Sequence, residues 1–151
     1  MSDEEGRGVI LLTRPAGQNE SLARRLSTRG YRTIERPLLE ILPLEPDDGA
    51  RKLIIDLDQF DDIIFVSGNA VEFGLPLLER YWPQWPVALH WAAVGPATAG
   101  RLPAGLSVTF PPTGASEAML QMERFAEVSG RKVMIVRGKG GRELLADTLR
   151  Q

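Results

Sequence analysis

The chain has 151 residues, a formal net charge of −2, one histidine and no cysteine. This length suits one compact domain and is short for two. The charge excludes a general attraction to nucleic acid or to an acidic membrane, and the single histidine, His90, excludes a multi-histidine metal site. Without cysteine there is no disulfide or thiol chemistry, which is compatible with a cytoplasmic location.

The N-terminal part predicts a βαβ unit. Residues 9–12 read as a short buried strand, residues 17–29 as a helix that Gly30 closes, and residues 31–35 as a second strand. Residues 36–46 alternate prolines with apolar residues, which is typical of a linker or crossover that leads into an edge strand.

The remainder predicts a regular alternation of strands and helices. The expected strands are 62–66, 90–94, 108–110 and 132–136, and the expected helices are 49–58, 69–80, 96–102, 116–128 and 142–150. This order predicts an α/β fold with a parallel, flavodoxin-like sheet and helices on both faces. Because the last helix is still running where the chain stops, we expect the fold to be C-terminally truncated.

Four loops follow the expected strands of the larger part, and parallel strands bring their carboxyl ends to one edge. Each loop combines glycine with a hydroxyl or amide at a helix start. Any one of them alone is explained as a turn or a cap, with Ser67 or Asn69 capping the helix after residue 66. The four together favour an anion-binding cleft whose candidate residues are Ser67, Gly68, Asn69, Ala70, Gly95, Thr98, Ser116, Arg137, Gly138 and Arg142.

The glycine-rich loop at 137–142 carries the most cations, and Arg14 places another after the first strand. It lacks the GxxxxGK[ST] and GxGxxG patterns, so nucleotide binding is disfavoured. Carboxylates suit its arginines as well as phosphates do. We expect Glu143 to hold Arg137 or Arg142 in place.

Other conspicuous residues favour structural roles. His90 has no evident acidic partner, and Trp82, Trp85 and Trp91 are expected to pack at the sheet edge or at a domain interface. No basic and aromatic residues interleave as in a nucleic-acid site. No catalytic nucleophile, carboxylate pair or metal cluster can be named from the residues, which predict a small-polyanion-binding protein.

The ordered segments LLTRP, PLLEI-x-P, FVSGNAV, AVGPATA, P-x3-SE-x-ML and VMIVRGKGGRELL-x3-L resemble the uroporphyrinogen-III synthase family over residues 9–150. The resemblance implies a lyase of tetrapyrrole biosynthesis that uses no metal or organic cofactor. Its substrate would be hydroxymethylbilane, a linear tetrapyrrole with eight carboxylates. The enzyme dehydrates this substrate and closes the macrocycle with inversion of the last pyrrole ring.

The resemblance also implies two similar α/β domains with the active site between them. Residues 1–36 would be the N-terminal piece of a discontinuous first domain, and residues 37–151 a nearly complete second domain. The proposed proton-donating tyrosine of the family would lie beyond Gln151, so we expect this chain alone to be inactive and the complete protein to be a monomer. A non-catalytic anion-binding or regulatory module on the same fold is the alternative.

Overall fold

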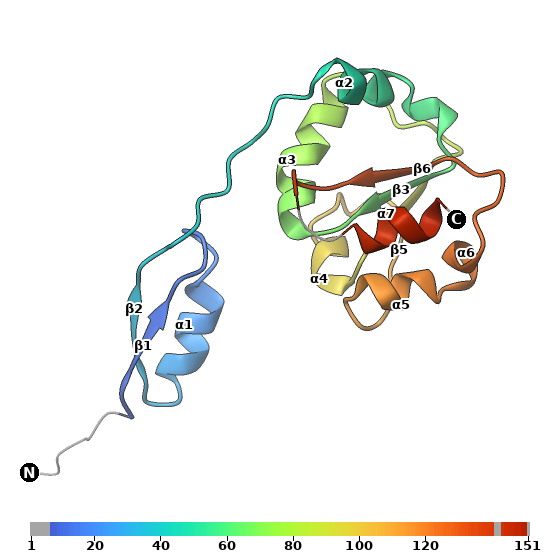
Figure 1. Cartoon of the computed structure of the whole chain (residues 1–151). Helices are drawn as coiled ribbons and strands as arrows, with labels where there is room; N and C mark the ends of the chain where they lie inside the picture. Colours follow the sequence, from blue (N-terminus) through green and yellow to red (C-terminus); the bar gives the residue numbers. More distant parts are fainter. Residues whose placement is uncertain (1–6, 141–142, 151) are drawn as a thin grey trace, which may run out of the picture. The chain divides into compact units, whose positions relative to one another are not determined.

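A computed structural model describes residues 7–140 and 143–150 of the chain. It divides into two compact units, Met1–Pro43 and Leu44–Gln151, which are described separately (Figure 1). No helix among the described residues is long and apolar enough to cross a membrane. Of the predicted site residues, Arg142 lies outside the described part of the chain.

The first unit is the predicted βαβ unit. Strands β1 (Val9–Leu12) and β2 (Arg32–Glu35) pair in parallel, and helix α1 (Glu20–Ser27) connects them. Gly30 adopts a φ of +81°, a left-handed conformation that suits glycine after a helix, as expected from the sequence. The sheet face that carries Val9 and Leu11 is exposed to solvent, and those side chains are 53% and 56% exposed. A unit this small buries little apolar surface of its own.

Residues 36–46 lead into helix α2 (Asp48–Ile55) and not into the edge strand that the sequence predicts. These residues are described but take part in no sheet, and Leu38, Leu39 and Leu42 are exposed. Prolines at positions 37, 43 and 46 supply no amide hydrogen for a ladder, so the segment stays irregular and serves only as a linker.

The second unit is a parallel sheet with helices on both faces, which confirms the predicted α/β fold (Figure 1). Its strands are β3 (Asp62–Phe65), β4 (His90–Ala93), β5 (Val108–Thr109) and β6 (Val133–Val136), in the spatial order β5-β4-β3-β6. Its helices are α2 (Asp48–Ile55), η1 (Leu57–Gln59), α3 (Gly68–Glu79), α4 (Pro96–Ala99), α5 (Ser116–Leu120), α6 (Glu123–Ala126) and α7 (Leu144–Leu149).

Two hydrophobic clusters fill the two faces of this sheet. Ile63 and Phe65 of β3 point into the cluster that α2 and α3 cover, whereas Ile64 points into the cluster of α5, α6 and α7. All three side chains are fully buried. This alternation along one strand explains why the apolar run is unbroken in the sequence.

The strand order differs in detail from that of flavodoxin. Here the chain runs outward from β3 through β4 to β5 and then returns to place β6 on the other side of β3. Flavodoxin places its first strand between the second and the third. Both orders are doubly wound, and both create a switch point where the direction of the winding reverses.

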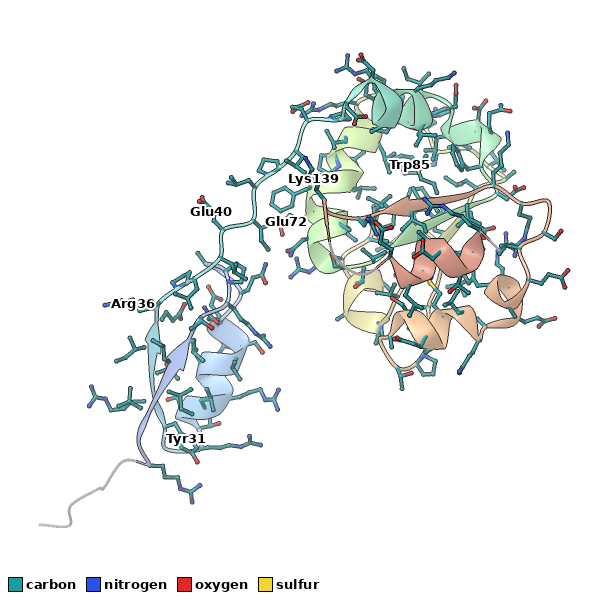
Figure 2. The ribbon with its side chains drawn as sticks, viewed as in Figure 1. Tyr31, Arg36, Glu40, Glu72, Trp85 and Lys139 are labelled. Carbon is teal, nitrogen blue, oxygen red and sulfur yellow. The ribbon has the colours of Figure 1, made fainter. Side chains whose placement is uncertain are left out.

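Two further expectations are corrected by the structure. The single helix expected at 116–128 is two short helices, because Met122 is extended at φ −70° and ψ 138°. Trp91 lies in the core rather than at a sheet edge, because β4 is an internal strand. It stacks on Phe65 with ring centroids 5.9 Å apart and meets the edge of Trp85, which Figure 2 labels, at 5.0 Å.

Candidate anion-binding site at the carboxyl edge of the sheet

The switch point of the sheet lies between β3 and β6. The chain leaves β3 toward β4 and comes back to β6, so the loops after these two strands diverge to opposite faces. In open α/β sheets, ligands bind in the crevice that such diverging loops leave at the carboxyl ends of the strands. The residues after β3 begin with Val66 and Ser67, and those after β6 begin with Arg137.

A cavity of about 220 Å³ opens at this point. Ser116, Arg137, Gly138 and Gly140 contribute the polar part of its lining, and Val66, Ile135, Leu145 and Ala146 contribute the apolar part. Among the described residues, the lining thus combines a cation, a hydroxyl-bearing side chain and glycine backbone with apolar walls. This combination suits a carboxylate on a short apolar arm.

Arg137 is held in place by Glu143, as the sequence predicts. Its guanidinium donates to Glu143 Oε1 at 2.8 Å, and its side chain is 28% exposed. Glu143 is 59% exposed and immediately precedes α7. The acidic partner fixes the direction of the arginine fork at the cavity, and partial burial strengthens the attraction of that fork for a second anion.

The start of α3 forms the neighbouring part of the edge. Ser67 is the N-cap, and its Oγ accepts from the backbone N–H of Ala70 at 3.1 Å, which confirms one of the two predicted caps. The Ser67 hydroxyl keeps a proton that it can donate to an anion. Gly68 and Asn69, both half-buried, complete the first turn.

Gly95 and Thr98 have structural explanations. A Cβ on Gly95 would lie 2.5 Å from Gly114 Cα, so glycine is required where these two loops touch. Thr98 is 7% exposed, and its amide donates to Gly95 O at 3.1 Å. Gly95 lies at the contact between the loops after β4 and β5, and Thr98 belongs to the first turn of α4. Direct contact with a ligand stays a prediction for both residues.

The structure thus brings only some of the predicted residues together. Ser116, Arg137 and Gly138 share one cavity, and the residues from Ser67 to Ala70 begin the adjacent helix. Arg14 is exposed at the end of β1 in the first unit.

One cation at this edge was missed by sequence reasoning. Arg101 follows α4 and lies against Gly68, with its Nε 2.8 Å from the position that a Cβ there would take. Its NH1 group approaches Glu72 Oε2 at 3.4 Å. Nothing in the local sequence signals this position, because it depends on how α4 packs on α3.

An ionic cluster was also missed at the opposite, amino end of the sheet. Asp62 is fully buried, and it accepts from Arg124 Nε at 2.5 Å and from Arg131 at 2.8 Å. His90 Nδ1 lies 3.0 Å from Asp62 Oδ1 without the alignment of a hydrogen bond, and His90 Nε2 lies 2.8 Å from Thr109 Oγ1. The expectation that His90 has no acidic partner is therefore wrong.

Burial is the main reason that the pKa of His90 lies below its ordinary value of 6.5. The positive charges of Arg124 and Arg131 also lower this pKa, whereas Asp62 acts in the opposite direction. The cluster joins β3 and β4 to α6 and to the turn before β6, and it lies at the end of the sheet opposite to the cavity.

Comparison with known proteins identifies a family for this chain. The family model described as uroporphyrinogen-III synthase HemD matches residues 20–151. Over 143 residues the chain is 34% identical to uroporphyrinogen-III synthase of Salmonella typhimurium and 33% identical to that of Escherichia coli, covering 93% of this chain and 58% of each relative. The synthase of Proteus mirabilis is 32% identical over 145 residues, which cover 94% of this chain and 73% of that protein.

The chain therefore spans little more than half the length of the Salmonella and Escherichia relatives. The matched region nevertheless includes β3, β6 and the cavity between their carboxyl ends. On the extent of the family match, the chain belongs to the uroporphyrinogen-III synthase family.

Proposed function

We propose that this chain binds hydroxymethylbilane and forms part of a uroporphyrinogen-III synthase. The observation that carries the proposal is the cavity at the switch point, where Arg137, Ser116 and the Gly138 backbone face one space. A linear tetrapyrrole offers carboxylates on short alkyl arms, which match a cationic pocket with apolar walls.

The reaction is redox-neutral and releases one water molecule. The terminal hydroxymethyl C–O bond breaks as its oxygen takes up a proton, which leaves an azafulvene. The substituted α-carbon of the last pyrrole ring attacks the azafulvene methylene and forms a spiro intermediate. The bond from that carbon to its original methylene bridge then breaks, and the freed methylene bonds to the other α-carbon of the same ring. That carbon loses its proton, and the macrocycle is closed with the ring inverted. Such a reaction requires an acid for the departing water, and we assign no residue of this chain to that role.

The contribution of the described residues would be to hold the substrate. Hydroxymethylbilane is flexible, and its direct closure without ring inversion competes with the enzymatic outcome. Fixing several carboxylates at one sheet edge restricts the chain to folded geometries, and orientation of this kind can supply a large part of a rate enhancement. The nearby cations and amides also offset the negative charge of the substrate carboxylates in a site from which water is partly excluded.

We expect the complete protein to work as a cytoplasmic monomer, with neither nucleic acid nor membrane as a partner. We also expect that the chain alone binds the substrate but does not complete the reaction. The reason is its extent, because the relatives contain a further part that this chain does not match.

The test uses freshly generated hydroxymethylbilane with this chain and with a version extended at its C-terminus to the length of the relatives. The isomers of the cyclised product are then separated, with the Escherichia coli enzyme as a positive control. Isomer III from the extended version alone is the expected result. Isomer I from both would overturn the proposed activity, and isomer III from the chain itself would show that the acid lies within these residues.

A further inference from the structure

We propose that Arg101 is a second carboxylate-binding arm of the site and that Glu72 holds it in place until the ligand arrives. The proposal rests on the proposed function, because it assigns a residue to the same polycarboxylate. Arg101 follows α4, and Glu72 lies on α3, where Figure 2 labels it.

The first observation is the close contact of Arg101 with the start of α3. The Nε, Cδ and Cζ atoms of Arg101 lie 2.8, 2.9 and 2.9 Å from the position that a Cβ on Gly68 would occupy. The flat guanidinium end therefore lies against the backbone, directly after the Ser67 cap. Only glycine leaves room for it without a shift of the arginine.

The second observation is electrostatic. The N-terminus of a helix carries a partial positive charge of about +0.5, so a cation there is unfavourable unless an anion accompanies it. Arg101 lies at the N-terminus of α3, a twelve-residue helix, and its ion pair with Glu72 offsets part of this cost. The helix end, the arginine and the Ser67 hydroxyl together attract negative charge.

The third observation is that the ion pair between Arg101 and Glu72 is weak enough for a ligand carboxylate to replace Glu72. The two charged groups are 3.4 Å apart, and the side chains are 51% and 55% exposed. Exposed pairs of this kind contribute about 0–1 kcal/mol. A ligand carboxylate can therefore replace Glu72 at little cost, whereas Arg137 is more buried and closer to its own acidic partner.

Arg101 and Arg137 are associated with two neighbouring strands of the sheet. Gly68 follows β3, and Arg137 follows β6, which is the neighbour of β3 in the sheet. Arg101 and Arg137 thus reach the same edge from different elements, and a ligand with several carboxylates can meet both. A ligand with one carboxylate cannot use the pair in this way.

The test measures binding of uroporphyrin III, a stable octacarboxylate, by fluorescence quenching. Arg101→Gln is expected to weaken binding by about tenfold, since a charge-assisted hydrogen bond is lost. Glu72→Gln is expected to strengthen binding by roughly threefold, because the competitor is removed. The double variant should bind like Arg101→Gln, and Arg101→Lys should retain part of the affinity.

A matched ion pair serves as the control. Arg80 and Glu45 are 3.3 Å apart with side chains 58% and 77% exposed, and Arg80 lies at the opposite end of α3. Arg80→Gln and Glu45→Gln carry the same charge changes and should leave affinity unchanged. Circular dichroism confirms that each variant is folded.

Two unfavourable results can be told apart. Wild-type affinity in Arg101→Gln, or an equal loss in Arg80→Gln, would overturn the role of Arg101 and leave the proposed function intact. No binding by the wild-type chain together with no isomer III from the extended version would overturn the proposed function and this inference with it.

Discussion

Asp62 and His90 are the first residues of two adjacent parallel strands, and they lie directly opposite one another in the register of β3 and β4. His90 Nδ1 lies 3.0 Å from Asp62 Oδ1, and Asp62 is fully buried. Arg124 and Arg131 reach the same carboxylate from α6 and from the segment that follows it. The amino end of the sheet is therefore held by a buried carboxylate with several basic neighbours.

The stability of the second unit should fall in mild acid because of His90. Its pKa is lowered mainly by burial, so the folded state binds fewer protons than the unfolded state near pH 6. The stabilisation from neutral His90 is fully present above pH 6.5 and is lost as the pH falls through the lowered value. Urea unfolding between pH 7.5 and 5 measures this change.

His90→Gln is the control for that titration. It retains a side chain that can bond to Thr109, but it cannot take up a proton beside Arg124 and Arg131. The free energy of unfolding should then vary less with pH over the same interval. An equal pH dependence in wild type and His90→Gln would assign the effect to other groups.

Removing the charge of Asp62 should be strongly destabilising. Asp62→Asn leaves two arginines without the carboxylate that accepts from both of them. We expect a loss of roughly 3 kcal/mol, the lower range for breaking a buried ion pair, since both arginines are partly exposed. Asp61→Asn is the matched control, because Asp61 is exposed. The amide oxygen of the introduced asparagine can still accept from the Lys132 N–H, as the Asp61 carboxylate does. Similar losses in both variants would contradict the special role of Asp62.

Local signals in the sequence were sufficient for much of the fold and for part of the site. The apolar run at 63–66 followed by Ser67 predicted both a buried strand and a capped helix, because capping and burial act within a few residues. The position of Glu143 beside Arg137 was likewise accessible, since both flank one short loop.

Features that depend on packing between distant segments could not be predicted from the sequence. The partnership of Asp62 with His90 requires the register of two strands, and the contact of Arg101 with Gly68 requires the packing of α4 on α3. The break at Met122 escaped detection because Met119 and Phe125 reach the same cluster from two short helices as they would from one long helix. An apolar pattern in a sequence predicts which side chains are buried. It predicts the conformation of the backbone between them less well.

The linker should be the first site of proteolysis. Glu40 lies in the irregular, exposed segment between β2 and α2 (Figure 2), where backbone can enter a protease. A glutamate-specific protease should cut there first and leave a stable core that contains Leu44–Gln151. Glu40→Gln should remove this first product, as mass spectrometry would show. Equally rapid cleavage within the helices of the second unit would contradict its independent stability.

The contact between Gly95 and Gly114 allows a paired test of loop packing. Gly95→Ala would place a Cβ 2.5 Å from the Cα of Gly114, so the backbone must move. We expect a loss of about 2 kcal/mol, as for overpacked interiors. Gly114→Ala is the control, since its Cβ would lie 3.7 Å from Gly95 Cα, an ordinary contact. Urea unfolding should separate the two variants, and equal stabilities would show that the loops adjust freely.

The last prediction concerns the cavity itself. Arg137→Ala should weaken binding of an octacarboxylate tetrapyrrole by about tenfold or more, because it removes the partly buried cation at the switch point. Glu143→Gln should change affinity far less, since it preserves the arginine while loosening its orientation. Arg80→Ala, at the other end of α3, controls for the loss of net charge. Fluorescence titration at two salt concentrations would compare the three variants, and wild-type affinity in Arg137→Ala would remove that residue from the site.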